Sequence, residues 1–238
     1  MMKIPFQLGD DVIHAVVHQK ECASPTMLNV HDDEDTSVEA GRKNIEHHGG
    51  RVIELVHTGE RLITFRLDGQ TYVFDPNRMF SDAGITATLR RYSKYSEAAH
   101  AAIKSLATLY LDRFALDREP LIIALHNIYD AVFSVESFAP PGNLSCDVAA
   151  THINPRHSKF DFFYVTEKRF YDYLKNRNFN VVLQDNERVT EDGSLSVYFA
   201  RKGIPYINVE AQIEHLANQI EMLEVVREML KSTNHGEV

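Results

Sequence analysis

Residues 27–37 of the chain read MLNVHDDEDTS and join a short apolar run to an acidic turn. Apolar runs of this length are typical of buried strands, so residues 27–30 are predicted to form a strand that leaves the sheet at His31. The chain must then turn, which brings the carboxylate of Glu34 back toward the His31 imidazole. An imidazole nitrogen and a carboxylate oxygen in this arrangement suit zinc. Because His-x-x-Glu pairs also occur by chance, a metal site depends on residues farther along the chain.

Strands and helices are predicted to alternate on both sides of this stretch. A helix is expected from Thr36 or Ser37 to about His48, with Glu39 completing a capping box and Gly49-Gly50 ending the helix. Asp68-Gly69 predicts a hairpin between residues 62–67 and 70–74. Further strands are expected at 12–17, 52–57, 120–125, 162–165, 179–183, 194–200 and 206–209, and helices at 96–114, 166–176 and 211–231. Residues 136–161 are expected to form a long irregular loop.

This alternation indicates an α/β sandwich with a mostly parallel sheet. We expect one domain over residues 1–231 and a disordered tail over residues 232–238. With 238 residues, 44% hydrophobic and 25% charged, the composition is that of an ordinary globular protein. Cys22 and Cys146 allow at most one disulfide, so a disulfide scaffold is excluded.

The net charge and the length of the apolar runs restrict which partners and which cellular compartment we expect. The formal net charge of −9 argues against nucleic acid or an anionic membrane as the main partner. The chain has no apolar run of about 20 residues, and its first 20 residues lack the apolar core of a signal peptide. We therefore expect a cytoplasmic protein with no membrane partner.

Three predicted strands end in a polar residue of the kind that enzymes use. These residues are His31, followed by Glu34, then His126 after residues 120–125, and Glu210 after residues 206–209. In an open α/β sheet, ligands bind outside the carboxyl ends of the strands, so these side chains are expected to converge. Two imidazoles and one carboxylate leave the fourth position of a tetrahedral zinc ion to water. Glu210 would then be a base for that water.

Each of these residues also has an ordinary structural interpretation. A single histidine at a strand end is more often a hydrogen-bonded surface residue than a metal ligand. Glu210, if it begins a helix, would serve the helix dipole. The acidic residues after His31 would be a solvated turn. These interpretations do not explain why all four side chains lie at strand ends.

Residues 75–80, Asp-Pro-Asn-Arg-Met-Phe, directly follow the second strand of the predicted hairpin. Pro76 makes the turn rigid, and Asn77 and Arg78 present an amide beside a guanidinium. Together these groups suit a carboxylate, because arginine binds it with planar geometry that lysine lacks. An isolated Asn-Arg pair after a strand is more often surface decoration.

These motifs, in this order, resemble a known family. His31-x-x-Glu34, Asp75-x-Asn77-Arg78-x-Phe80, Leu125-His126-Asn127 and Val209-Glu210 are similar to the motifs of the aspartoacylase and succinylglutamate desuccinylase family, within the zinc carboxypeptidase superfamily. The resemblance implies a three-layer αβα sandwich with a mixed central sheet. It also implies one zinc ion held by His31, Glu34 and His126, with Glu210 as general base and Asn77 and Arg78 holding a substrate carboxylate.

The sequence departs from the family pattern at three places. Asp32 stands where the family has a glycine, and Gln70 stands near the position of an arginine that polarises the scissile carbonyl. Arg201 resembles another family arginine and is the candidate for this role, with Arg90 and Arg91 as alternatives. Arg66 is predicted at the hairpin tip, about 13 Å from Asp75. The C-terminal domain that covers the site in the family is missing, which predicts a more open site.

The resulting prediction is a zinc hydrolase that cleaves an amide bond next to a free carboxylate. Its substrate would be an N-acyl amino acid or a short peptide. The alternative is a catalytically silent module that holds an anionic ligand through Arg78. The sequence leaves the oligomeric state open.

Overall fold

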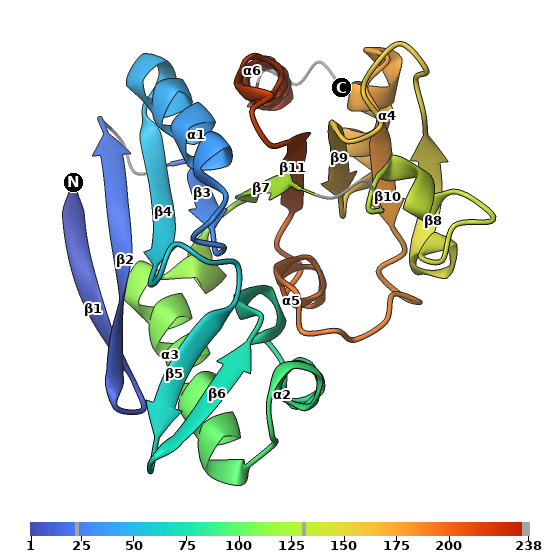
Figure 1. The fold of residues 1–238 in the computed structure, drawn as a ribbon. Coiled ribbons are helices and arrows are strands. Elements are labelled where there is room, and N and C mark those ends of the chain that lie inside the picture. The colour runs from blue at the N-terminus through green and yellow to red at the C-terminus, as the bar shows by residue number, and fades with distance from the viewer. Residues whose placement is uncertain (22–23, 130–131, 235–238) are drawn as a thin grey trace.

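The computed structural model of the chain describes residues 1–21, 24–129 and 132–234. Its main sheet has nine strands: β1 Met2–Leu8, β2 Asp11–Lys20, β3 Thr26–Asn29, β4 Gly50–Val56, β7 Ile122–Ile128, β8 Val148–His152, β9 Phe162–Val165, β10 Val181–Gln184 and β11 Tyr206–Gln212. Their order across the sheet is β1-β2-β4-β3-β7-β11-β9-β10-β8 (Figure 1). The central strands β4, β3, β7 and β11 are parallel. On either side of them, β2 is antiparallel to β4, and β9 is antiparallel to β11 but parallel to β10.

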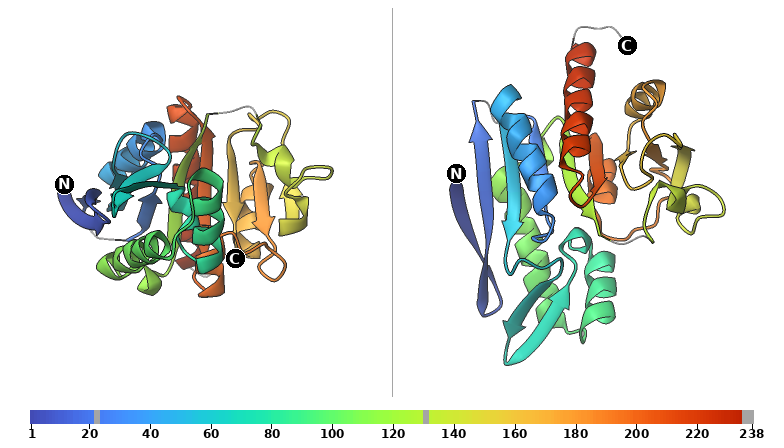
Figure 2. Two further views of the ribbon diagram at one scale, coloured as in Figure 1. Left: turned by 60° about the horizontal axis from the view of Figure 1, so that its bottom comes forward. Right: turned by 45° about the horizontal axis from the view of Figure 1, so that its top comes forward.

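Helices and a small hairpin cover the two faces of the sheet (Figure 2). The helices are α1 Asp35–His48, α2 Asp82–Tyr92, α3 Glu97–Phe114, α4 Lys168–Asn176, α5 Leu195–Arg201 and α6 Leu216–Asn234. Short 3-10 helices are η1 Pro76–Arg78, η2 Leu116–Arg118, η3 Val135–Phe138 and η4 Ser145–Asp147. One buried core contains side chains of α2, α3, α5 and the hairpin formed by β5 Ile63–Leu67 and β6 Gln70–Phe74. The core on the opposite face contains side chains of α1, α4 and α6.

The central strand β7 shows why its sequence is apolar throughout. Ile122 and Ala124 belong to the core under α2 and α3, whereas Ile123 and Leu125 belong to the core under α1 and α6. A strand buried on both faces needs apolar residues at every position, not alternating ones. The alternation continues to His126, which therefore lies on the same face as Ile122 and Ala124.

The structure confirms the predicted α/β fold, with parallel strands at the centre of a mixed sheet. The predicted hairpin is also confirmed, since Leu67 pairs with Gln70 across Asp68-Gly69. All four side chains on its inner face, Ile63, Phe65, Tyr72 and Phe74, are buried.

Several predicted elements are wrong. Residues 194–200 do not form a strand: Leu195 and Phe199 are four positions apart and both pack into one core from helix α5. The predicted helix over 211–231 begins only at Leu216, because β11 continues to Gln212. The first 25 residues contain two long strands rather than one edge strand, and β1 is the edge. Residues 136–161 include β8, which forms the other edge. Helix α2 has no counterpart among the predicted elements.

The C-terminal boundary of the predicted domain differs in the structure. Helix α6 extends through residues 232–234, which were predicted to be a disordered tail, and residues 235–238 lie outside the described residues.

Of the two cysteines, Cys22 lies outside the described residues, and Cys146 is a free thiol. Within the described part of the chain, no helix has the length and apolar character needed to cross a bilayer.

Candidate metal centre and active site

The adjacent strands β3, β7 and β11 bring three predicted site residues together. β7 and β11 are parallel, and Glu210 is the register partner of His126. Neighbouring residues in register point to the same side of a sheet, so the two side chains lie next to each other on one face. His31 follows β3, which pairs with the other edge of β7. The expected convergence is therefore present, but His126 and Glu210 lie within β7 and β11, two residues before the last residue of each strand, and not after the strands as predicted.

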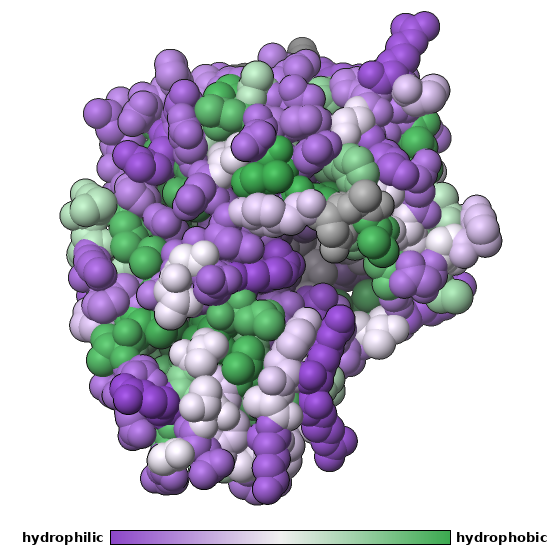
Figure 3. Space-filling view, in the orientation of Figure 1, coloured by the Kyte–Doolittle hydropathy of each residue, from purple (hydrophilic) through white to green (hydrophobic). Residues whose placement is uncertain are grey.

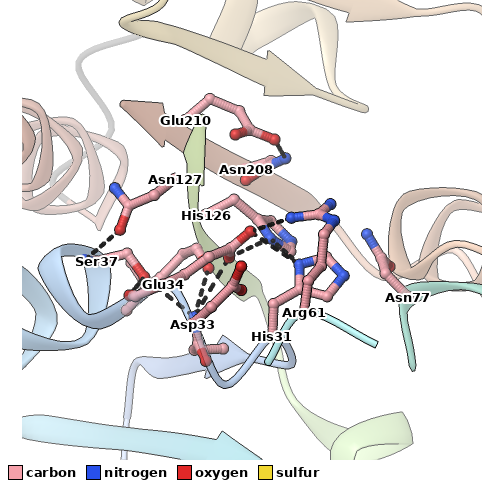
Figure 4. Close-up of polar contacts among 12 residues, drawn as sticks. His31, Asp33, Glu34, Ser37, Arg61, Asn77, His126, Asn127, Asn208 and Glu210 are labelled. Atoms are coloured by element: carbon pink, nitrogen blue, oxygen red, sulfur yellow. Dashed lines mark hydrogen bonds and ion pairs between the residues drawn. The ribbon is translucent and has the colours of Figure 1, made fainter. Parts of the chain in front are cut away.

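His31, Glu34 and His126 form a compact buried group that could hold a metal ion. His31 Nδ1 lies 2.9 Å from Glu34 Oε1 and 3.2 Å from His126 Nδ1. His126 Nδ1 lies 2.8 Å from Glu34 Oε2. In Figure 4 these three side chains are directed toward one another.

The donor set fits zinc. Bonds of about 2.1 Å in tetrahedral geometry hold ligand atoms about 3.4 Å apart, somewhat farther than the 2.8–3.2 Å found here. The other ring nitrogen of His31, Nε2, lies 2.9 Å from Asp75 Oδ1. Metal-binding histidines commonly donate their second N–H to a carboxylate, which fixes the ring and leaves the first nitrogen for the metal.

The charges of this group favour a cation at its centre. Burial opposes a charge on His31, but the Glu34 and Asp75 carboxylates outweigh it and raise the pKa of His31 to about 9. Burial likewise opposes ionisation of Glu34, yet the two imidazoles hold the pKa of that carboxyl well below its usual range. In the metal-free protein a proton on His31 supplies the positive charge, and a metal ion must displace it.

Glu210 is a buried carboxyl beside this group. Asn208, two residues earlier on the same face of β11, donates from Nδ2 to Glu210 Oε1 over 2.9 Å. Burial raises the pKa of Glu210, and the charge of Glu34 raises it further, against opposing effects of His126 and Arg61. Because β11 continues past it, Glu210 does not begin a helix, and the helix-dipole interpretation is wrong. A carboxyl with a raised pKa in a cavity is suited to accept and return a proton.

Arg61 lies at the site but is not among the residues predicted from the sequence. Its Nη1 donates to Glu34 Oε1 over 2.7 Å, and its side chain remains 46% exposed. Arg61 lies in the segment that follows β4, a strand parallel to β3, so the same strand-end rule could have found it. Arg66, the nearest arginine considered from the sequence, instead pairs with Asp11.

Asp32 holds the segment that carries Arg61. Its Oδ2 accepts from the backbone N–H of His57 over 2.6 Å and from that of Gly59 over 2.7 Å. Asp32 is therefore part of the structure around the site and not a solvated acidic residue. Its position is the one where the family pattern has glycine.

The turn of Asn77 and Arg78 is attached to the metal-ligand group. Asp75 Oδ1, which contacts His31, also accepts from the Asn77 backbone N–H over 2.8 Å. Asn77 Oδ1 in turn accepts from the Leu195 backbone N–H over 3.0 Å. Arg78 Nη1 donates to its neighbour's carbonyl over 2.7 Å. Its Nη2 lies 3.6 Å from Asp192 Oδ2, longer than a charge-assisted hydrogen bond.

A glycine lets the segment of Asp192 lie directly on this turn. Gly193 has a φ of +77°, and a Cβ there would lie 2.6 Å from the Arg78 carbonyl oxygen. It would also lie 2.7 Å from the Cα of Gly84 in α2. The close approach therefore requires glycine at 193, in both conformation and space.

The structure does not bring Arg201 to the site. It lies at the end of α5, pairs with Glu191 and has a side chain that is 55% exposed. The helical course of α5, where a strand is predicted, places it there. The alternatives Arg90 and Arg91 lie over the rings of Tyr95 and Tyr92.

A cavity of about 490 Å³ opens beside the metal-ligand group. The molecular face in Figure 3 is hollowed near its centre, with hydrophilic side chains along part of the hollow. The polar lining of the cavity includes Arg61, Asn77, Arg78, His126, Asn208 and Glu210. A second cavity of about 240 Å³ is also lined by Arg61 and Glu210, together with Glu34. Arg61 and Glu210 thus lie between the two spaces.

Comparison with known proteins finds solved structures with a similar fold. No protein-family model and no curated protein sequence matches the chain. A gene product of Agrobacterium tumefaciens has a similar fold, with a TM-score of 0.52 and 10% identity over 93% of this chain and 94% of that one. A candidate metallopeptidase of Shewanella denitrificans matches with a TM-score of 0.45 and 11% identity over 98% and 83% of the two chains. Succinylglutamate desuccinylase of Vibrio parahaemolyticus matches with a TM-score of 0.42 and 14% identity over 98% and 67%.

Proposed function

We propose that the chain is a zinc-dependent hydrolase that cleaves an amide bond next to a free carboxylate. The observation that carries this proposal is the pairing in register of Glu210 with His126. It sets a buried carboxyl with a raised pKa beside three convergent metal-type ligands, at the edge of a cavity. A structural metal site is closed by its protein ligands and requires neither an additional base nor an adjoining cavity.

Each residue of the site has a part in this reaction. His31, Glu34 and His126 would hold one zinc ion, which when bound acidifies water and polarises a carbonyl. Glu210 accepts a proton from the attacking water and returns it to the leaving nitrogen, while Asn208 orients the carboxyl.

The remaining side chains would bind the substrate. Arg61, between the two cavities, has guanidinium N–H groups besides the one that binds Glu34, and these stabilise the developing oxyanion. Arg61 takes the role that was predicted for Arg201 from the sequence. Asn77 and Arg78 bind the substrate carboxylate.

The test is turnover by zinc-loaded protein of N-acyl amino acids and short peptides with a free carboxylate. We expect hydrolysis that a chelator abolishes and added zinc restores. Stoichiometric zinc without turnover of any of these amides would contradict the proposal and favour a silent module that binds an anion.

Arg78→Lys is expected to lower kcat/KM for a free-acid substrate by about 10- to 150-fold. The reason is that a hydrogen bond to a charged group contributes about 1.5–3 kcal/mol to binding. Lysine keeps the charge but loses the two-pronged geometry. The measurement is the ratio of kcat/KM for the free acid to that for its amide, which has no carboxylate to hold. Arg66→Lys, at the exposed pair with Asp11, is the matched control. An unchanged ratio in Arg78→Lys would show that another group holds the carboxylate.

A further inference from the structure

One side of the larger cavity is apolar and has no part in the reaction described above. Four rings form it, those of Phe133, Phe138, Phe162 and Tyr164, here called the aromatic wall. Phe138 lies 5.6 Å from Phe133, 5.9 Å from Phe162 and 5.3 Å from Tyr164 between ring centroids, in tilted or edge-on arrangements. Such a cluster favours contact with another ring, because tilted aromatic pairs gain energy beyond their buried area.

The acidic side chains of this cavity already have partners. Asp147 Oδ1 accepts from the backbone N–H of Thr190 over 2.9 Å and from its hydroxyl over 2.8 Å. Asp192 accepts from the Ser194 backbone N–H over 2.9 Å and faces Arg78. Neither carboxylate therefore needs a basic group from a ligand. Both would repel a second carboxylate on a substrate side chain.

Asn77 and Arg78, the aromatic wall and Glu210 line the same cavity. In an N-acyl amino acid the carboxylate, the side chain and the scissile nitrogen are all attached to one Cα. A substrate held by Arg78 with its amide at Glu210 must therefore place its side chain elsewhere in this space. The cavity of about 490 Å³ is within the usual size for small ligands.

We propose that the aromatic wall is a subsite for an aromatic side chain on the amino acid released by the reaction. The inference rests on the proposed function and narrows it to N-acyl aromatic amino acids, or peptides that end in one. Acidic amino acids are disfavoured, because their side-chain carboxylate would face Asp147, Asp192 and the apolar rings.

The test uses binding to the metal-free protein, so that it does not depend on catalysis. Calorimetry with N-acetyl-L-phenylalanine, N-acetyl-L-alanine and N-acetyl-L-aspartate compares one ring, one methyl group and one carboxylate. We expect the phenylalanine derivative to bind about 10- to 100-fold more tightly than the alanine derivative, from burial of the ring. The aspartate derivative should bind most weakly. Equal affinity for the phenylalanine and alanine derivatives would overturn the proposal.

Two variants connect that preference to the cavity. Leu144 also lines it and is only partly buried, so Leu144→Asn adds polarity without removing a core residue. Phe138→Leu removes a ring but keeps apolar volume. Both should reduce the phenylalanine-to-alanine ratio several-fold, whereas Leu109→Asn, at a half-exposed position on α3, should not. With circular dichroism showing native structure, an unchanged ratio in both variants would refute the subsite.

Measurements of amide hydrolysis distinguish the aromatic subsite from the proposed hydrolase function. Aromatic preference in binding without amide hydrolysis by the zinc-loaded protein supports the subsite and contradicts the hydrolase. Hydrolysis with equal kcat/KM for phenylalanine and alanine substrates supports the hydrolase and contradicts the subsite.

Discussion

We expect wild-type protein purified without chelator to carry about one zinc ion per chain, and His126→Ala to lose most of it. Among the residues that the structure describes, His126 Nδ1 is one of three grouped donors, so its loss removes one third of the protein ligands. Metal analysis of the purified variant measures the loss. His31→Ala should behave in the same way.

The control for this experiment is His18→Ala, because His18 lies on β2 and pairs with Glu54 away from the group. It should retain full zinc. Zinc should also raise the melting temperature of the wild type and of the control, because a ligand that binds the folded state stabilises that state. It should not raise the melting temperature of His126→Ala, which has lost a zinc ligand. Full metal content in both His31→Ala and His126→Ala would show that the ion is bound elsewhere.

Glu210→Gln is expected to keep the zinc and the fold but to lower kcat by about 10²- to 10⁴-fold, the usual contribution of a general base. Glutamine retains the shape of the side chain and an oxygen for the Asn208 amide, but it cannot accept a proton. The measurements are kcat on an amide substrate and zinc content. Glu136→Gln, at an exposed pair with Lys159, should leave both unchanged. Activity within a few-fold of wild type would assign Glu210 a structural role.

The same residue predicts the pH dependence. Burial raises the pKa of Glu210 in the metal-free protein, so ionisation of this carboxyl requires a higher pH than that of an exposed glutamate. Only the ionised form is a base, so kcat/KM of the zinc-loaded protein should rise as the pH increases through the pKa that Glu210 has in that form. The residual activity of Glu210→Gln should lack this rise.

Local sequence and topology together were enough to predict the centre of the site. His31 and His126 each follow or end an apolar run, and parallel strands direct their carboxyl ends to one edge of the sheet. The hairpin at Asp68-Gly69 was predictable for a similar reason, since a two-residue turn sets the pairing of its own flanking residues. The hairpin depends on a short sequence separation, whereas the meeting of His31 and His126, which are 95 residues apart, follows from the strand-end rule for parallel strands.

The tertiary structure alone decided which arginine enters the site. Arg61 and Arg201 both follow strands predicted from the sequence, so the strand-end rule admits both arginines and does not choose between them. Two backbone hydrogen bonds from Asp32 hold the segment that carries Arg61 over Glu34. Arg201 is directed to Glu191 because residues 195–201 form a helix.

The sequence by itself therefore determined the α/β class, the hairpin and the convergence of His31, Glu34 and His126, because strand period is local and the carboxyl ends of parallel strands meet at one edge of the sheet. The tertiary structure decided the helical form of α5, the entry of Arg61 and the assembly of the aromatic wall. The wall joins side chains from two stretches of the chain, near residues 133–138 and in β9. Such contacts between distant segments depend on how the helices and loops pack against the sheet, which no single segment encodes.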